Sequence, residues 1–191
     1  MSQGIWSTWY VISSLIEDKA NPSIDVLLNY VEGMHTTASS VSRILPFATE
    51  ASWATGRWQT LEKYTSMATE DIGEDFNVNV GSALLSLYRK DIAGFTSTVN
   101  SVREQIASSM SMVSSLSIGA CHDTMLKFHV LTELEIIAGT DSPEVENGQI
   151  IESLNRRLAV LGAYLNDKQY LLGIRRAALQ LSRYVYSIPD P

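Results

Sequence analysis

Apolar residues recur along most of the chain at intervals of three and four, the spacing that places side chains on one face of an α-helix. The first such run is Leu27, Val31, Met34, Ala38, Val41 and Leu45. Comparable runs are Val80, Leu84, Leu87 and Tyr88; Val99, Val102, Ile106, Val113 and Leu116; Ile151, Leu154, Leu158, Leu161 and Leu165; and Tyr170, Ile174, Ala177, Leu181 and Tyr184. Alternating segments of strand length are nearly absent, so the pattern predicts an all-α protein.

Turn-forming and polar residues divide this pattern into about nine helices with short connections. The breaks are expected at Asn21 and Pro22, Gly56 and Arg57, and residues 69–75, 89–91, 114–119, 139–148 and 166–168, with Pro189 ending the last helix. Pro46 is expected in the first turn of the third helix, where its missing N–H costs little. Consecutive helices with short links pack as antiparallel neighbours. We therefore expect residues 1–191 to form one segment of an α-solenoid, built from tetratricopeptide-like or HEAT-like antiparallel helical hairpins.

Trp53 and Trp58 flank Gly56 and indicate where one hairpin turns. Residues five apart on a helix point about 140° away from each other, so one amphipathic helix cannot bury both rings on one face. Glycine ends helices in left-handed geometry without a steric penalty. We therefore expect two helices that meet at Gly56, with both tryptophans largely buried near the turn.

Composition narrows the class of protein and of partner. The 191 residues are 45% hydrophobic and 18% charged, which suits a folded domain. The net charge of −7 disfavours nucleic acid and anionic membranes as partners. Cys121 is the single cysteine, so no intramolecular disulfide can form, as in a reducing compartment such as the cytosol or nucleus. The apolar stretch 5–16 lacks a preceding basic residue and a cleavage site, and we interpret it as a buried helix and not as a signal peptide.

The candidates for chemistry are weak. Cys121, His122 and His129 could suggest a metal site, but on one helix the two histidines lie about 10 Å apart along the axis, too far to share an ion. His129 and Glu133 share a helix face, which is not enough for a site. The tripeptide Asp75-Phe76-Asn77 resembles a kinase metal-binding motif, but the other parts that phosphoryl transfer needs are missing. We predict no catalytic, cofactor-binding or metal-binding residues, and we interpret Phe76 as the hydrophobic start of a helix.

Four arginines form the one candidate interaction patch: Arg156, Arg157, Arg175 and Arg176. If the last hairpin folds about residues 166–168, these four guanidinium groups come to a similar height. Two interpretations remain open. The arginines pair with carboxylates such as Glu133, Glu135 or Glu152 and hold the last two hairpins together, or at least two of them face solvent and dock an acidic surface.

Several segments together resemble the FAT domain of the phosphatidylinositol kinase-related protein kinases, in particular that of fungal ATR-type checkpoint kinases. They are EASWATGRWQTLEKY at 50–64, FNVNVGSALLSLYRKDIAGF at 76–95, HVLTELE at 129–135 and LNRRLAVLGAYLNDKQYLLGIRRAALQLS at 154–182. The resemblance covers roughly residues 32–186, and residues 1–31 match less clearly.

The resemblance implies a non-catalytic helical scaffold within a much larger nuclear serine/threonine kinase of the DNA-damage checkpoint. Its partners would be the rest of the parent kinase chain, and also a second kinase copy or a regulatory subunit. No cofactor, nucleic acid or membrane is implied. The alternative is a free-standing tetratricopeptide-like adaptor that binds a peptide in a concave groove. The first helices of most predicted pairs are poor in Lys and Arg, which favours the scaffold.

Overall fold

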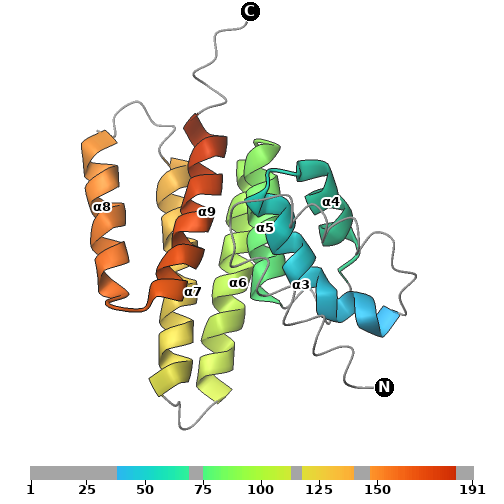
Figure 1. Cartoon of the computed structure of the whole chain (residues 1–191), viewed down its shortest axis with the longest axis horizontal. Helices are drawn as coiled ribbons and strands as arrows, with labels where there is room; N and C mark the ends of the chain where they lie inside the picture. Colours follow the sequence, from blue (N-terminus) through green and yellow to red (C-terminus); the bar gives the residue numbers. More distant parts are fainter. Residues whose placement is uncertain (1–37, 69–74, 113–117, 140–146, 184–191) are drawn as a thin grey trace, which may run out of the picture. The chain divides into compact units, whose positions relative to one another are not determined.

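The computed structural model describes residues 38–68, 75–112, 118–139 and 147–183. Within these ranges the regular structure is entirely helical (Figure 1). The helices are α3 (Ala38–Ala54), α4 (Trp58–Ser66), α5 (Phe76–Tyr88), α6 (Ile92–Met112), α7 (Ile118–Ala138), α8 (Asn147–Val160) and α9 (Leu165–Arg183). The predicted all-α class is confirmed. The helix expected at residues 5–16, the break at Asn21 and Pro22, and the break at Pro189 lie outside the described residues.

The contacts within the chain divide it into two units, Met1–Gly81 and Ser82–Pro191. The boundary falls inside α5, so the first residues of this helix belong to the first unit and the rest to the second. Each unit has its own buried apolar residues.

In the first unit, α3 and α4 form the hairpin expected around Gly56. α3 ends at Ala54, α4 begins at Trp58, and Gly56 has a φ of 72°. The amide of Arg57 donates to the carbonyl of Ser52 at 2.9 Å, which closes the end of α3. Trp53 is 4% exposed, whereas Trp58 is only half-buried. Trp58 stands in the first turn of α4 and is less completely buried than Trp53, so full burial is found only for Trp53.

Pro46 lies inside α3 and not at the start of a helix. A proline in a helix interior removes one backbone hydrogen bond and costs about 3 kcal/mol. Burial of the residues around it opposes this cost, because Leu45, Ala48 and Ala51 are each at most 1% exposed. The prediction of a separate third helix that begins at Pro46 is thus wrong, since tertiary packing outweighs the local preference.

Gly81 marks a close approach of α5 to the α3–α4 hairpin. A Cβ atom at this position would lie 2.3 Å from Cγ2 of Thr49 and 3.1 Å from Cδ1 of Leu61. Any side chain larger than hydrogen would push both neighbours away. The three helices of the first unit therefore depend on glycine here for its small size.

Aspartates begin two of the helices. Oδ1 of Asp75 accepts the amides of Asn77 at 2.8 Å and of Val78 at 3.2 Å, so Asp75 caps α5. Phe76 is the first residue of that helix, as predicted. Asp91 accepts the amide of Gly94 at 2.8 Å in the first turn of α6. The predicted turn at 89–91 is confirmed, with Lys90 in the left-handed region at a φ of 60°.

The second unit is arranged around α7, which lies between α6 on one side and α8 and α9 on the other (Figure 1). Apolar side chains are found all around α7, as expected for a helix with neighbours on several sides. Its most extensive partner is α9, which runs in the same direction, while α6 and α8 run oppositely. The main core side chains here are Phe95, Val99, Val130, Leu131, Leu134, Ile137, Leu154, Leu161, Leu171 and Ile174.

A buried ion pair connects three helices of this unit. Glu133 of α7 is 1% exposed and Arg175 of α9 is 8% exposed. Nε and Nη2 of Arg175 donate to the two carboxylate oxygens of Glu133 at 2.9 and 2.7 Å. Nη2 also donates to the backbone carbonyl of Leu154 in α8 at 2.8 Å. One guanidinium group thus fixes α7, α8 and α9 relative to one another.

Replacement of Trp53 by Ala should lower the free energy of unfolding by about 3–5 kcal/mol, because it leaves a large cavity in the first unit. Nε1 of Trp53 is buried and makes no hydrogen bond to any described residue, so the ring contributes through packing. Trp53→Phe should therefore cost clearly less. Urea unfolding of the 191-residue chain measures both; equal losses for Ala and Phe would show that packing is not the reason.

Replacement of Glu133 by Ala should destabilise the chain by about 3–5 kcal/mol, because it leaves the Arg175 guanidinium buried without its counter-ion. The double variant Glu133→Leu with Arg175→Met should recover much of this loss, since no charge then remains buried. Glu152→Ala is the matched control, because Glu152 forms an exposed i,i+4 pair with Arg156 and its loss should leave the unfolding midpoint unchanged. A Glu133→Ala variant as stable as this control would contradict the prediction.

Candidate functional site

The last hairpin turns earlier than the sequence indicates. α8 ends at Val160 and α9 begins at Leu165, with Gly162 at a φ of 57° between them. Asn166, Asp167 and Lys168, predicted as the turn, instead form the first turn of α9. Asp167 suits this place because a carboxylate near a helix N-terminus interacts favourably with the helix dipole. The predicted turn was wrong because Gly162, which can adopt the left-handed conformation easily, is the residue that reverses the chain.

The four arginines consequently do not lie at one height. With the turn at residues 161–164, position 175 is level with about position 150, which is about 9 Å along the axis from Arg156. Their environments also differ. Arg175 is buried on Glu133, Arg156 is exposed and paired with Glu152 one turn earlier, Arg157 is half-buried, and Arg176 is exposed. The internal-pairing interpretation is confirmed for Arg175, which joins α9 to α7, whereas a patch of four arginines is not formed.

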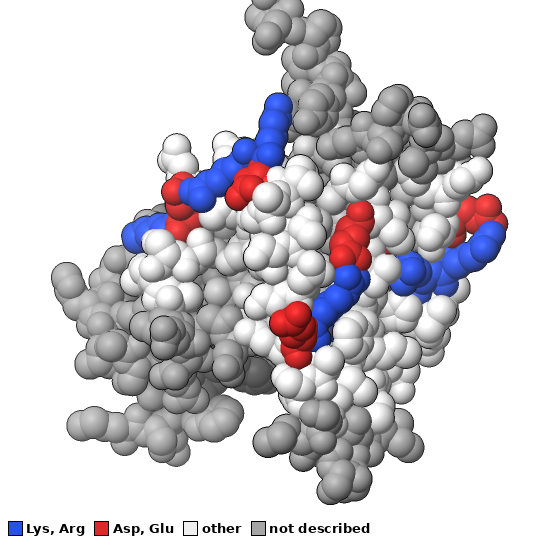
Figure 2. Space-filling view, turned by 180° about the vertical axis from the view of Figure 1, so that it is seen from behind, with Lys and Arg blue, Asp and Glu red and all other residues white. Residues whose placement is uncertain are grey.

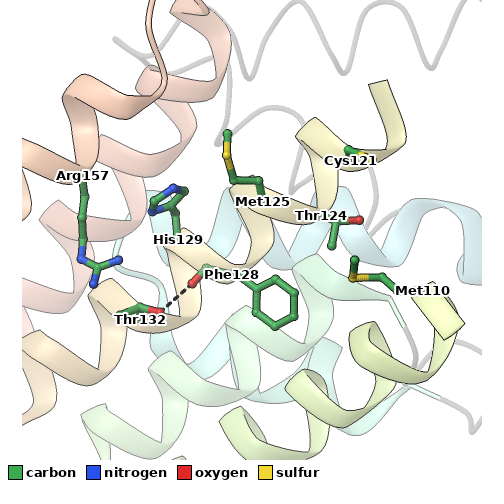
Figure 3. A pocket seen from close by; sticks show the side chains of 8 residues that line it. All are labelled: Met110, Cys121, Thr124, Met125, Phe128, His129, Thr132 and Arg157. Carbon is green, nitrogen blue, oxygen red and sulfur yellow. Dashed lines mark hydrogen bonds between the residues drawn. The ribbon is translucent and has the colours of Figure 1, made fainter. Parts of the chain in front are cut away.

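Arg157 lines a pocket between α6, α7 and α8 (Figure 3). The pocket has a volume of about 330 Å³ and opens to solvent. Its surface is mainly apolar, with Met110 from α6 and Met125 and Phe128 from α7. The remaining lining residues are Cys121, Thr124, His129 and Thr132.

Two polar atoms of this pocket are buried without a hydrogen bond to the described chain. They are Nε of Arg157 and Nδ1 of His129. Arg157 projects from α8 and His129 from α7, and the two side chains lie near each other at one end of the pocket (Figure 3). A buried donor left without an acceptor costs about 1–3 kcal/mol, so such groups in folded proteins usually have a role. Sequence reasoning missed this pair, since no spacing rule relates residues on different helices.

His129 is held neutral by its surroundings. Burial is the main cause that lowers the pKa of His129 below its ordinary value of 6.5, and the positive charge of Arg157 lowers it further. Glu133 acts in the opposite direction, but less strongly. The pocket therefore disfavours an additional positive charge.

The other histidine considered as a metal ligand lies elsewhere on α7. Nε2 of His122 lies 2.6 Å from Oδ2 of Asp167 on α9, and its ring centroid lies 4.1 Å from that of Tyr164. His122 thus links α7 to the beginning of α9. Glu133, which shares a helix face with His129, accepts hydrogen bonds from Arg175. Among the described residues, no group of three or more His, Cys, Asp or Glu side chains is placed to hold a metal ion.

Charged side chains on the face shown in Figure 2 occur as small groups of opposite sign with wide uncharged surface between them. One further pair, Arg103 with Glu135, connects α6 to α7. In the part of the chain that the structure describes, no extended basic surface appears on this face. No described helix has both the length and the apolar character needed to cross a bilayer.

The pKa of His129 gives a specific pH dependence. Because the folded-state pKa lies below 6.5, the unfolded chain binds the proton first, and stability from this residue is full above pH 6.5 and falls as the pH is lowered below it. Urea midpoints measured from pH 7.5 to 5.5 should therefore decline less in His129→Gln than in the unmodified chain. Arg157→Gln should raise the pKa of His129, measured by NMR of its ring protons; an unchanged titration would contradict the assigned cause.

The chain is 28% identical over 132 residues to protein kinase rad3 of Schizosaccharomyces pombe. This alignment covers 69% of the present chain but only 5% of the yeast protein, so the chain corresponds to a small part of that relative. The sequence profile of the FAT domain matches residues 45–187, which include all the described helices from the middle of α3 to α9. The chain therefore belongs to the FAT domain family, as its resemblance to that domain indicated.

Proposed function

We propose that this chain is a non-catalytic scaffold segment in the FAT region of a nuclear DNA-damage checkpoint kinase of the ATR type, where it supports the position of the kinase domain. The family match and the similarity to protein kinase rad3 support the type of parent protein. The family match is to the FAT domain, which supports the non-catalytic role. Its main partner is the rest of the parent kinase chain.

An exposed apolar surface at the α8–α9 turn is the observation that carries this proposal. Val160, Tyr164 and Leu165 are 59%, 59% and 65% exposed, and all three lie within six residues of the chain. Leu172 is also exposed and is seven residues after Leu165, so it extends from the same face of α9. We call these four residues the tip surface. Large apolar side chains that are exposed close together along the chain are typical of surfaces that a partner covers.

Two apolar positions of the predicted helical run are exposed, and one of them, Leu165, belongs to the tip surface. The helical spacing placed Leu165 in one apolar run with Leu154 and Leu161, yet only the latter two are buried. Ile151, from the same run, is 53% exposed. In a stack of helical hairpins each unit contacts its neighbours, so apolar residues on an outer face are covered by the next hairpin. The pattern of the sequence thus fits a segment that packs against further helices of the parent chain.

The alternative, a free-standing adaptor with basic anchors in a concave groove, has less support. Such an adaptor needs cations on successive helices that are free to bind a ligand. Arg175 instead forms an ion pair with Glu133 inside the protein, and Arg156 forms one with Glu152 on its own helix.

Replacement of Leu165 and Leu172 by Asp should leave the 191-residue chain as stable as before, because both side chains are already exposed. In the full-length parent kinase the same two changes should reduce the yield of soluble, assembled kinase at least several-fold, because they place charge in an apolar contact. Asn155→Asp, at an exposed position of α8, is the matched control.

Two results would contradict the proposal in different ways. Normal assembly of the Leu165→Asp and Leu172→Asp kinase would exclude the tip surface as a packing face. ATP-dependent phosphorylation by the purified 191-residue chain would show that it is catalytic.

A further inference from the structure

The pocket between α6, α7 and α8 shares no residue with the tip surface. Its walls are built by Met110, Met125 and Phe128, which offer a soft apolar surface. A well-packed helix interface fills such a space with side chains. Here about 330 Å³ remains open beside two buried polar atoms that lack partners.

The polar side of the pocket is suited to a hydrogen-bond acceptor that carries negative charge. Nε of Arg157 is an N–H donor that reaches no acceptor in the described chain. The guanidinium group presents its donors in a fork that matches a carboxylate. Nδ1 of His129 is also buried, so the half-buried Arg157 is the member of this pair that a ligand would contact.

No carboxylate among the lining residues competes for this donor. Glu133 lies one turn beyond His129 on α7, but both of its oxygens accept from Arg175. The neighbouring Arg156 is already paired with Glu152 on the surface of α8. In a chain with a net charge of −7, the pocket is therefore a local positive site without its counter-charge.

We propose that this pocket binds an acidic side chain of a protein partner, presented next to an apolar side chain, with Arg157 receiving the carboxylate and the methionines and Phe128 covering the apolar neighbour. Small-molecule sites usually enclose most of their ligand and range from about 300 to 1,000 Å³. This pocket is at the lower end of that range and is open, which suits one or two side chains projecting from a larger partner. The inference does not depend on the parent kinase, because it uses only residues of the second unit.

The test uses the 191-residue chain and two blocked tripeptides, acetyl-Leu-Glu-Leu-amide and acetyl-Leu-Gln-Leu-amide. NMR should show that the glutamate peptide shifts the methyl signals of Met110 and Met125 with a Kd on the order of 1 mM, which is typical for a contact of this size. The glutamine peptide should bind at least five-fold more weakly. Binding of the glutamate peptide should also raise the pKa of His129, because a negative charge then lies beside it.

The variants separate recognition from folding. Arg157→Gln should weaken the glutamate peptide at least five-fold while the melting temperature stays the same, since Nε of Arg157 has no partner to lose. Arg157→Lys should bind with intermediate strength, because it keeps the charge but not the fork. Arg156→Gln is the matched control on the adjacent position and should bind like the unmodified chain.

Three outcomes would overturn the proposal. Equal binding of the two peptides would show that the carboxylate is not recognised. Unchanged affinity in Arg157→Gln would show that this residue is not the receptor. Tighter binding of inorganic phosphate than of the glutamate peptide, with the same signals shifted, would indicate a general anion site.

Discussion

The buried pair between Glu133 and Arg175 is the interaction on which the arrangement of the second unit depends. A charged group that leaves water is costly unless its partner and hydrogen bonds are complete. Here the guanidinium group satisfies both carboxylate oxygens and one backbone carbonyl, so α7, α8 and α9 must keep one register for all three bonds to form. Apolar contacts alone would tolerate small shifts between these helices, but three directional bonds to a single group do not.

This constraint also explains how the remaining polar groups of the second unit are distributed. Both carboxylate oxygens of Glu133 accept hydrogen bonds from Arg175. Nε of the half-buried Arg157 has no hydrogen-bond acceptor in the described chain, and this side chain lies near His129. His129 lies beside this guanidinium group, and its pKa is lowered by burial and by the positive charge of Arg157. An acidic residue beside Arg157 would pair with its guanidinium group and would stabilise the folded protein. The open pocket and the exposed tip surface are the two places where we propose that other protein covers this segment.

The two proposed interfaces are chemically different. The tip surface is apolar and belongs to the hairpin turn, as expected where one helical repeat meets the next. The pocket is small and mainly apolar, and Arg157 is the one charged residue among those that line it, apart from the titratable His129. Large apolar contacts provide assembly, whereas a few placed polar groups provide selection between partners.

Much of the fold could be predicted from the sequence because it depends on local chemistry. The three- and four-residue spacing gave the helices, Gly56 gave the reversal between Trp53 and Trp58, and the polar residues 89–91 gave the turn before α6. The FAT assignment could also be made from ordered sequence segments, and the family profile confirms it. The misplaced turn at residues 166–168 and the misplaced helix start at Pro46 have different causes. Gly162, in the left-handed conformation, reverses the chain before residue 166, whereas burial of the residues around Pro46 outweighs the preference of proline for a helix start.

Only the tertiary structure decided what each polar residue does. Arg156 and Arg157 are adjacent in the sequence, but one pairs on the surface and the other faces a pocket, because neighbouring positions on a helix diverge by about 100°. Leu161 and Leu165 share the helical spacing, yet one is core and the other is exposed, because the chain reverses between them. The sequence by itself thus determined that this protein is helical and where most of its helices lie, since periodicity and turn residues act over a few positions. Which charges are buried, paired or left open was decided by contacts between helices far apart in the chain.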